Sequence, residues 1–252
     1  MITKWKIGFK TRGSDLFDLS GLNVWETPDT QYEADPFLIK HNGENFLFYE
    51  LYDHKKGVIA YSRMSNLTTV APVICLEEDF HLSYPSIFKH NGEIYMVPEM
   101  GASSRIGLYR AVGFPDKWEV VKTIYGKPTT DNDIFFFRVV WYLFTNNYGN
   151  DNSLLILKSN DPLGNWEFHY TNEYHHSRGA GHPFIRNGKL TRPTQDGDEL
   201  YGRGVVLKEL QLPFYQEEIV DRIEPDIVPG IVGVHTFNYN EDWVCVDLKY
   251  KI

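Results

Sequence analysis

Two segments of the chain share one order of apolar and polar positions. Residues 34–50 have a short apolar run, then Asn42-Gly43, then a second apolar run that ends at Glu50. Asn-Gly between apolar runs is typical of a two-residue β-hairpin turn, because both turn positions need positive φ. Residues 84–99 repeat this order, and three pairs of matching positions are each 49 apart: Pro36 and Pro85, Gly43 and Gly92, Glu50 and Glu99. The spacing predicts a repeated hairpin.

Three weaker copies follow at residues 133–146, 182–195 and 235–247. In the five copies the second strand ends at a polar residue, namely Glu50, Glu99, Asn146, Gln195 and Asp247, so the steps are 49, 47, 49 and 52. Units of about fifty residues are typical of propeller blades. The sequence therefore predicts an all-β fold, a five-bladed β-propeller with four-stranded antiparallel blades.

The two chain ends are expected to share one blade. Residues 6–10 are similar to residues 105–110, which would form the third strand of the second blade, whereas the last hairpin, at 235–249, has no third strand after it. Sharing a blade closes the ring and leaves no open sheet edge. With no linker or low-complexity segment, residues 1–252 are expected to form a single domain.

Composition narrows the possible partners. The net charge is −9 and aromatic residues make up 15% of the chain, so a nucleic-acid surface is not expected. Because we find neither a signal-peptide pattern nor an apolar stretch that could span a bilayer, we expect a cytoplasmic protein without membrane insertion. Cys75 and Cys245 are too few for a disulfide framework. The sequence leaves the oligomeric state open.

A propeller would bring polar residues from all five units to one mouth of its channel. The start of each first strand and the end of each second strand emerge on the same face, which gathers Asp35, Tyr84, Asp133, His182 and His235 with Glu50, Glu99, Asn146, Gln195 and Asp247, and Asp131, Asp196 and Arg192 close by. Strand ends are usually solvated, so each residue alone could simply cap backbone groups. Acids, histidines and an arginine together favour a binding or catalytic site.

Glycoside hydrolysis is the chemistry that such a ring of acids favours. It needs one carboxylate as base or nucleophile and one carboxylic acid of raised pKa as acid, and crowded acids raise each other's pKa. We expect Asp35, Glu99 and Asp133 to be catalytic. The residues expected to bind substrate are Tyr84, Glu50, His182, Arg192, Gln195, Asp196 and His235. Tyr84, Tyr52 and Trp141 are possible sugar-stacking surfaces, although core packing explains Trp141 equally well.

Several motifs carry a resemblance to known families. Ala34-Asp-Pro-Phe before an Asn-Gly hairpin is similar to the first-blade signature of the five-bladed glycosidases of families 43, 32, 68 and 130. The whole chain more closely resembles the N-terminal propeller domain of plant glucosamine inositolphosphorylceramide transferases and its free-standing bacterial relatives. This resemblance rests on Ser83-Tyr-Pro-Ser-Ile-Phe, Val97-Pro-Glu, Gly181-His-Pro-Phe, Arg192-Pro-Thr-Gln-Asp196 with Tyr201-Gly, and Gly233-Val-His-Thr-Phe-Asn238.

The resemblance to family 43 implies roles for individual acids. The Asp of the first blade is the general base there, a role that falls on Asp35, and a second Asp that tunes the pKa values matches Asp133. The general-acid Glu of that family begins an inner strand, whereas Glu99 ends a second strand here. Family-43 channels often hold calcium near a histidine, so the resemblance makes calcium beside His235 or His182 possible; no other cofactor is implied.

The sequence leaves three functions open. The first is a carbohydrate-active enzyme that cleaves or transfers a glycosyl unit in the central pocket, with an oligosaccharide or a cell-envelope glycan precursor as substrate. The second is a non-catalytic glycan-binding module, which should have an aromatic platform without a carboxyl pair. The third is a glycosyltransferase component of envelope glycan synthesis, disfavoured because no nucleotide-binding motif is present.

Overall fold

The computed structural model describes residues 3–26, 31–64, 71–149, 153–172, 178–196, 201–225 and 229–251. In these residues β-strands dominate, and the one helical element is a single 3-10 turn, η1 (Gly101–Ser103). No helix among them has the length and apolar character that a bilayer crossing requires.

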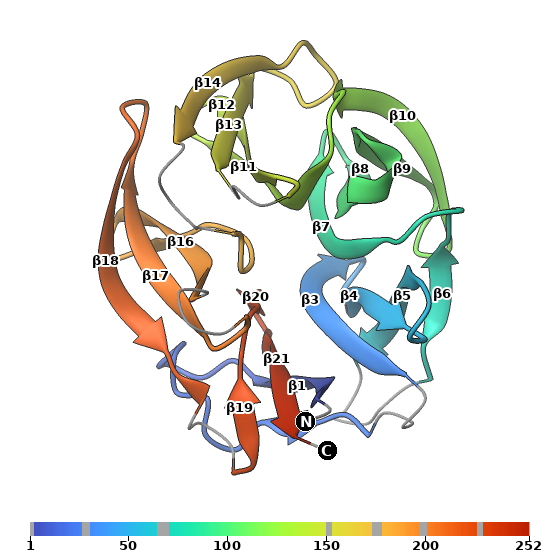
Figure 1. Cartoon of the computed structure of the whole chain (residues 1–252), viewed down its shortest axis with the longest axis vertical. Coiled ribbons are helices and arrows are strands. Elements are labelled where there is room, and N and C mark those ends of the chain that lie inside the picture. Colours follow the sequence, from blue (N-terminus) through green and yellow to red (C-terminus); the bar gives the residue numbers. More distant parts are fainter. Residues whose placement is uncertain are drawn as a thin grey trace.

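Five antiparallel sheets are arranged in a ring, and this arrangement confirms the five-bladed propeller (Figure 1). Four blades are built from consecutive strands. The first blade is β3 (Tyr32–His41), β4 (Glu44–Tyr52), β5 (Gly57–Met64) and β6 (Val73–Leu76); the second is β7 (Ser83–His90), β8 (Glu93–Glu99), β9 (Ile106–Gly113) and β10 (Lys117–Tyr125); the third is β11 (Thr129–Phe137), β12 (Val140–Asn147), β13 (Leu154–Ser159) and β14 (Glu167–Asn172); the fourth is β15 (Phe184–Arg186), β16 (Lys189–Asp196), β17 (Gly204–Gln211) and β18 (Gln216–Ile223).

The fifth blade combines the two ends of the chain, as the sequence predicts. Its strands are β19 (Ile231–Gly233), β20 (Phe237–Tyr239), β21 (Trp243–Lys251), β1 (Thr3–Thr11) and β2 (Asn23–Val24). β1 pairs with β21 along its whole length, and the termini lie side by side (Figure 1). The inner strand is split into β19 and β20, which both pair with β21. The split occurs where the N–H groups of His235 and Thr236 donate to the Asp247 carboxylate.

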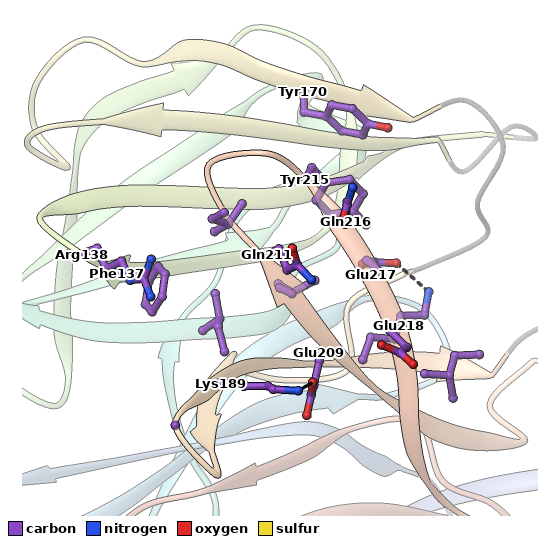
Figure 2. A pocket seen from close by; sticks show the side chains of 16 residues that line it. Phe137, Arg138, Tyr170, Lys189, Glu209, Gln211, Tyr215, Gln216, Glu217 and Glu218 are labelled. Atoms are coloured by element: carbon purple, nitrogen blue, oxygen red, sulfur yellow. Dashed lines mark hydrogen bonds and ion pairs between the residues drawn. The ribbon is translucent and has the colours of Figure 1, made fainter.

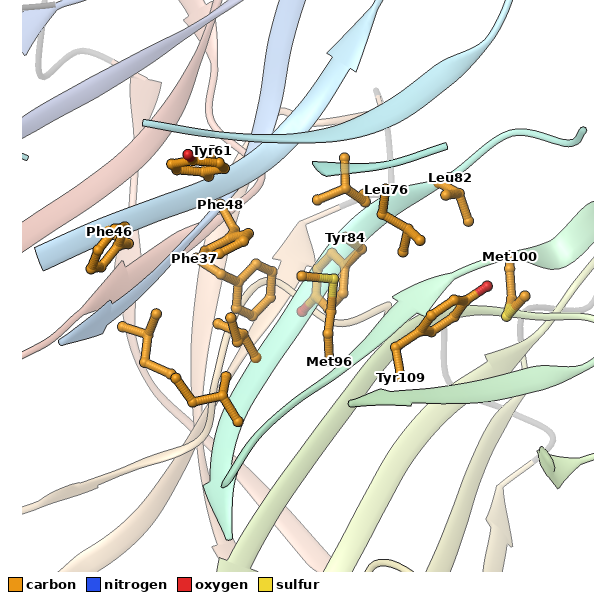
Figure 3. Packing of buried hydrophobic residues seen from close by; sticks show 14 residues of the cluster. Phe37, Phe46, Phe48, Tyr61, Leu76, Leu82, Tyr84, Met96, Met100 and Tyr109 are labelled. Atoms are coloured by element: carbon orange, nitrogen blue, oxygen red, sulfur yellow. The ribbon is translucent and has the colours of Figure 1, made fainter. Parts of the chain in front are cut away.

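Apolar side chains fill the space between neighbouring blades. The cluster between the first and second blades includes Phe37, Phe48, Tyr84 and Met96, all without measurable exposure (Figure 3). Each buried side chain of this size contributes about 1.5–3 kcal/mol to folding. Because every blade face is covered in this way, the strand ends at the channel mouth are held on a rigid frame.

The inner strands of the first three blades contain the same irregularity. Their pairing with the second strand shifts register just after Ala34, Ser83 and Thr130. The next residue has positive φ in each case: Asp35 at 52°, Tyr84 at 47° and Asp131 at 49°. Such a β-bulge turns a side chain and its N–H out of the ladder, and bulges of this kind occur beside active sites. In the third blade, the counterpart of Asp35 is therefore Asp131 and not Asp133.

Candidate functional site

Six of the side chains expected at the channel mouth lie close enough to one another to interact electrostatically. They are Asp35, Glu50, Glu99, Asp131, His235 and Asp247. They come from the first, second, third and fifth blades, and five are buried, with Glu99 partly exposed. Burial and mutual repulsion are the conditions that shift the pKa of a carboxyl group.

One side of the mouth is a line of three groups, Asp35, His235 and Asp247. His235 Nδ1 lies 2.5 Å from Asp247 Oδ2, and Nε2 lies 3.5 Å from Asp35 Oδ1. The imidazole also stacks on Trp5, with ring centroids 4.1 Å apart. The two carboxylates raise the pKa of His235 to about 9, although burial opposes this. The imidazole is therefore charged near neutral pH.

Both carboxyl oxygens of Asp35 accept hydrogen bonds. The Thr236 hydroxyl donates to Oδ1 at 3.0 Å, and the Tyr84 N–H donates to Oδ2 at 3.3 Å. Burial is the largest cause of the pKa shift, and the charge of His235 opposes it, so that the pKa of Asp35 rises to about 7. Asp35 can therefore both take up and release a proton near neutral pH.

The other side of the mouth is built from Glu99, Asp131 and Arg178. The Arg178 guanidinium binds Asp131 through two hydrogen bonds of 2.5 and 3.0 Å, and it lies 3.8 Å from Glu99 Oε2. Burial and the charge of Asp131 raise the pKa of Glu99 to about 8, against the opposing charge of Arg178. Glu99 is therefore mainly protonated at neutral pH, which suits a general acid.

The bulged residues connect these groups around the channel. The N–H of Asp35 donates to Asp247, the N–H of Tyr84 to Asp35, and the N–H of Asp131 to Glu99. Each of these bonds runs from one blade to the carboxylate of the preceding blade. Because positive φ directs each N–H sideways, the bulges fix the carboxylates relative to one another.

Tyr84 and Asp133 lie within the protein rather than at its open mouth. The Tyr84 ring is fully buried in the cluster of Figure 3, packed edge-on against Phe37. Its hydroxyl donates to Asp133 Oδ1 at 2.8 Å and accepts the Gly181 N–H at 2.6 Å. Burial raises the pKa of Asp133 well above its usual range, against the opposing charge of Arg192. Neither residue presents an open surface to a ligand.

The remaining residues predicted to bind substrate lie in different surroundings. Gln195 reaches the mouth and donates to the Gly179 carbonyl at 2.9 Å. His182 lies against the Ile87 carbonyl, with Nε2 3.0 Å from the oxygen, and burial lowers its pKa to about 4. Arg192 and Asp196 pair with residues of the outer strand β18, at 3.3 Å from Glu217 and 2.6 Å from Arg222 respectively.

The sequence did not indicate three residues that lie at the mouth. Arg178 and Tyr201 come from the connections on either side of β15 and β16, and the guanidinium lies 5.5 Å from the centre of the Tyr201 ring. Tyr201 is 49% exposed and is an aromatic surface that a sugar can reach. His81 precedes β7, with its Nε2 3.1 Å from Glu50 Oε1. All three lie outside the repeated hairpins.

Asp131 could have been identified from the sequence. The second-strand ends are 47 residues apart between Glu99 and Asn146. Adding this step to Tyr84 gives position 131, whereas Asp133 follows only from a constant step of 49. The register of the third blade selects Asp131, because the shift in pairing begins just after Thr130.

Calcium does not fit the residues around His235. Within the described part of the chain, one group of potential metal ligands lies within 4.8 Å, namely Asp35, His235 and Asp247. Calcium takes six to eight oxygen ligands, and this group offers two carboxylates and an imidazole. Asp247 Oδ1 already accepts two backbone N–H groups, from His235 and Thr236. We derive no chemistry through calcium.

A cavity of about 1040 Å³ lies between the third and fourth blades, and none of the acids of the channel mouth lines it. Tyr170, Tyr215, Lys189 and Glu217 are among its lining residues (Figure 2). Burial raises the pKa of the Tyr215 hydroxyl above its usual value. The charges of Arg192 and Lys208 lower the pKa of Glu217, against the effect of burial. A lowered pKa does not suit Glu217 for the role of general acid, so proton-transfer chemistry favours the channel mouth.

Replacing Gly181 by alanine should destabilise the protein by about 3 kcal/mol or more. Gly181 has φ of 126°, and a Cβ there would lie 2.1 Å from the Phe237 carbonyl oxygen, a backbone atom that cannot move aside. Gly188→Ala is the control, because Gly188 also has positive φ (78°) but open space around it. It should cost about 1 kcal/mol. Equal losses in urea unfolding would contradict the steric explanation.

The stability of the protein should fall by about 1 kcal/mol or more per pH unit from about pH 6 to pH 9. Folding raises the pKa of Asp35 from 3.8 to about 7 and that of Glu99 from 4.5 to about 8, so the folded state holds protons that the unfolded chain releases. The stabilisation from charged His235 is complete below 6.5 and is lost as pH rises through about 9.

Urea unfolding at several pH values measures this slope. Glu99→Gln removes one of the titrating groups, so its slope between pH 6 and 8 should be shallower than that of the wild type. An identical slope in the two proteins would show that Glu99 does not bind its proton in the folded state.

Comparison with known proteins places this geometry in context. The family model described as "Glucosamine inositolphosphorylceramide transferase 1, N-terminal" matches residues 24–222. The glucosamine inositolphosphorylceramide transferase 1 of Oryza sativa subsp. indica is 35% identical over 197 residues, which are 72% of this chain and 26% of that protein. The chain therefore spans about a quarter of the length of this relative.

Solved structures show the same fold at low sequence identity. A family 117 glycoside hydrolase of the marine bacterium Zobellia galactanivorans is 15% identical with a TM-score of 0.60, over 96% of this chain and 90% of that one. A mutant family 32 β-fructofuranosidase of Bombyx mori in complex with sucrose is 15% identical with a TM-score of 0.62, over 86% of this chain and 55% of that one. These likenesses concern the fold.

Proposed function

Because this chain belongs to the family of N-terminal domains of glucosamine inositolphosphorylceramide transferases, we propose that it is a carbohydrate-active protein whose ligand binds at the channel mouth. More specifically, the protein cleaves or transfers a glycosyl unit that binds at the channel mouth. Structural neighbours that are glycoside hydrolases, one of them in complex with sucrose, support a carbohydrate ligand.

A pair of carboxyl groups with raised pKa is the observation that carries this proposal. Asp35 has a pKa of about 7 and Glu99 of about 8, and the charge of Asp35 is one cause of the shift at Glu99. The two groups lie on neighbouring blades and are fixed by backbone N–H donors. Glycoside hydrolysis needs one group of each kind, a carboxylate and a carboxylic acid, at neutral pH.

The proposed reaction transfers two protons. The protonated Glu99 gives its proton to the glycosidic oxygen as the bond to the anomeric carbon breaks. Ionised Asp35 takes a proton from the water that attacks this carbon, or attacks the carbon itself in a retaining reaction. In the inverting case, exchange with solvent then returns Glu99 to the acid and Asp35 to the carboxylate. In the retaining case, water hydrolyses the glycosyl ester of Asp35 and gives a proton to ionised Glu99, which restores both groups.

We assign the tuning of the two pKa values to Asp131 in place of Asp133. Asp131 raises the pKa of both catalytic carboxyls, and Arg178 holds its side chain in place. Asp133 is buried, accepts a hydrogen bond from Tyr84, and is not among the causes of either shift. A carboxylate shifts the pKa of a neighbouring carboxyl group through its charge. The charge of Asp131 acts on both Asp35 and Glu99, which favours Asp131 as the tuning residue.

A non-catalytic glycan-binding module is the second candidate. The hydrogen bonds to both oxygens of Asp35 and the paired contact between Asp131 and Arg178 favour it, because such a network can be purely structural. The matched part is about a quarter of a relative whose name describes a transferase. A domain of this kind could bind the glycan on which another domain acts.

A screen for hydrolysis and binding separates the two candidates. Wild-type protein is incubated with aryl glycosides and with oligosaccharides of xylose, galactose, fructose and glucosamine, and released sugar is measured. Isothermal titration calorimetry with the same oligosaccharides measures binding. Turnover supports the enzyme, binding without turnover supports the glycan-binding module, and the absence of both contradicts the proposed carbohydrate function.

A further inference from the structure

Four side chains form a ring-lined surface on the first blade, which we call the tyrosine–histidine shelf: Tyr32, Tyr52, His54 and His81. The ring centroids of Tyr32 and Tyr52 are 4.7 Å apart, with 33° between the planes. His54 and His81 lie 5.8 and 5.7 Å from Tyr52. The tyrosines are half-buried and His54 is exposed, so solvent reaches the shelf.

The shelf adjoins the acids of the channel mouth. Tyr52 ends β4 two residues after Glu50, and Tyr32 begins β3 three residues before Asp35. Burial and the charges of Glu50 and Asp35 raise the pKa of Tyr32 above its usual value. A ligand that extends from the mouth across the first blade therefore reaches these rings first.

His81 is held in one orientation. Its Nδ1 accepts the Gly57 N–H at 3.0 Å, so in the neutral ring the proton is on Nε2, which faces Glu50 Oε1 at 3.1 Å. Gly57 allows this approach, since a Cβ there would lie 2.7 Å from both Glu50 Oε1 and His81 Cε1. The His81 side chain is 40% exposed and that of Glu50 is 7% exposed. The position of His81 in the shelf is therefore fixed. Its ring faces the solvent, whereas the Glu50 carboxylate behind it is buried.

We propose that the tyrosine–histidine shelf binds a second sugar unit, linked to the unit in the channel mouth, so that the ligand is an oligosaccharide. This inference rests on the proposed carbohydrate function. Tyrosine rings offer flat apolar faces to the C–H side of a sugar, and their hydroxyls, like imidazole, exchange hydrogen bonds with sugar hydroxyls. The carboxylates of Glu50 and Asp35 beside the shelf disfavour an anionic unit and favour a neutral or basic one.

Ladders of sugars of increasing length test the shelf. Dissociation constants for mono-, di- and tetrasaccharides of xylose, galactose, fructose and glucosamine are measured by calorimetry in an Asp35→Asn background, which prevents turnover. Tyr52→Ala removes the central ring of the shelf, and Tyr52→Phe keeps the ring without its hydroxyl. Tyr170→Ala is the matched control, since Tyr170 is also stacked on a tyrosine, Tyr215, at 4.6 Å, but in the cavity of Figure 2.

We expect the tetrasaccharide of the preferred ladder to bind roughly three- to tenfold more tightly than its monosaccharide. Tyr52→Ala should bring this ratio close to one, whereas Tyr52→Phe should keep most of it and Tyr170→Ala all of it. A ratio near one in the parent protein, a ratio unchanged by Tyr52→Ala, or no binding of any ladder would overturn the shelf.

Hydrolysis of the same ladders by wild-type protein separates this inference from the proposed function. Turnover together with a ratio unaffected by Tyr52→Ala rejects the shelf and keeps the enzyme. A ratio that depends on Tyr52 without any turnover keeps the shelf and rejects the enzyme in favour of the glycan-binding module.

Discussion

Replacing Asp35 by asparagine should lower the turnover of any glycoside that the wild-type protein hydrolyses by about 10³-fold. The amide can neither take a proton from water nor attack the anomeric carbon. It retains an oxygen that can accept the hydrogen bond of the Thr236 hydroxyl, so the fold should persist. The value of kcat on the best substrate of the screen, with circular dichroism to monitor folding, tests this expectation.

Two further variants make the test of Asp35 specific. Asp133→Asn should change kcat by less than about threefold, because Asp133 does not contribute to the pKa shift of Asp35 or Glu99 and the amide oxygen can accept the Tyr84 hydroxyl. Glu99→Gln should slow substrates with poor leaving groups by about 10²–10⁴-fold, and activated aryl glycosides much less, since these leave without a proton. A wild-type rate in Asp35→Asn would remove Asp35 from the chemistry.

Removal of residues 1–11 should unfold the protein. β1 makes nine residue pairs with β21, and its Ile7 and Phe9 side chains are almost fully buried in the fifth blade. Their loss costs about 1.5–3 kcal/mol for each side chain, before the broken backbone pairing is added. Since the total stability of a domain is about 5–15 kcal/mol, the remaining chain should lack a cooperative thermal transition.

Adding β1 back as a separate peptide provides the control. A synthetic peptide of residues 3–11 supplied during refolding should restore part of the transition, because the exposed edge of β21 is a template for an antiparallel strand. A truncated protein that melts at the wild-type temperature would show that β1 does not close the ring.

The strands and their number could be predicted from the sequence because their causes are local. Asn42-Gly43 and Asn91-Gly92 adopt positive φ at both positions and form the turns of the first two hairpins, as the dipeptide predicts. Alternation of apolar residues then defines the strand on each side of the turn. The shared fifth blade could be predicted by counting strands. The last hairpin, at residues 235–249, has no third strand after it, and residues 6–10 resemble a third strand without a hairpin of their own.

The composition of the site was only partly predictable. Asp35, Glu99, His235 and Asp247 occupy matching positions of the repeated hairpins, so the repeat placed them at the mouth. Asp133 was predicted in place of Asp131 because the spacing of two blades was extended to the third, where the bulge lies two residues earlier than this spacing predicts. The 47-residue step from Glu99 to Asn146 indicates this earlier position, whereas the register shift itself depends on pairing between strands.

The fold class, the number of blades, the closure by both termini and the gathering of acids at one mouth could all be predicted without the structure. These follow from periodicity and turn chemistry, which act over a few residues. The pairing of acids with bases became clear only from the folded arrangement: Arg178, in the connection before β15, binds Asp131 of β11, and His81 lies beside Glu50. Both contacts involve a residue that lies outside the repeated hairpins, Arg178 or His81, and the charge of Arg178 lowers the pKa of Glu99, on which the proposed chemistry depends.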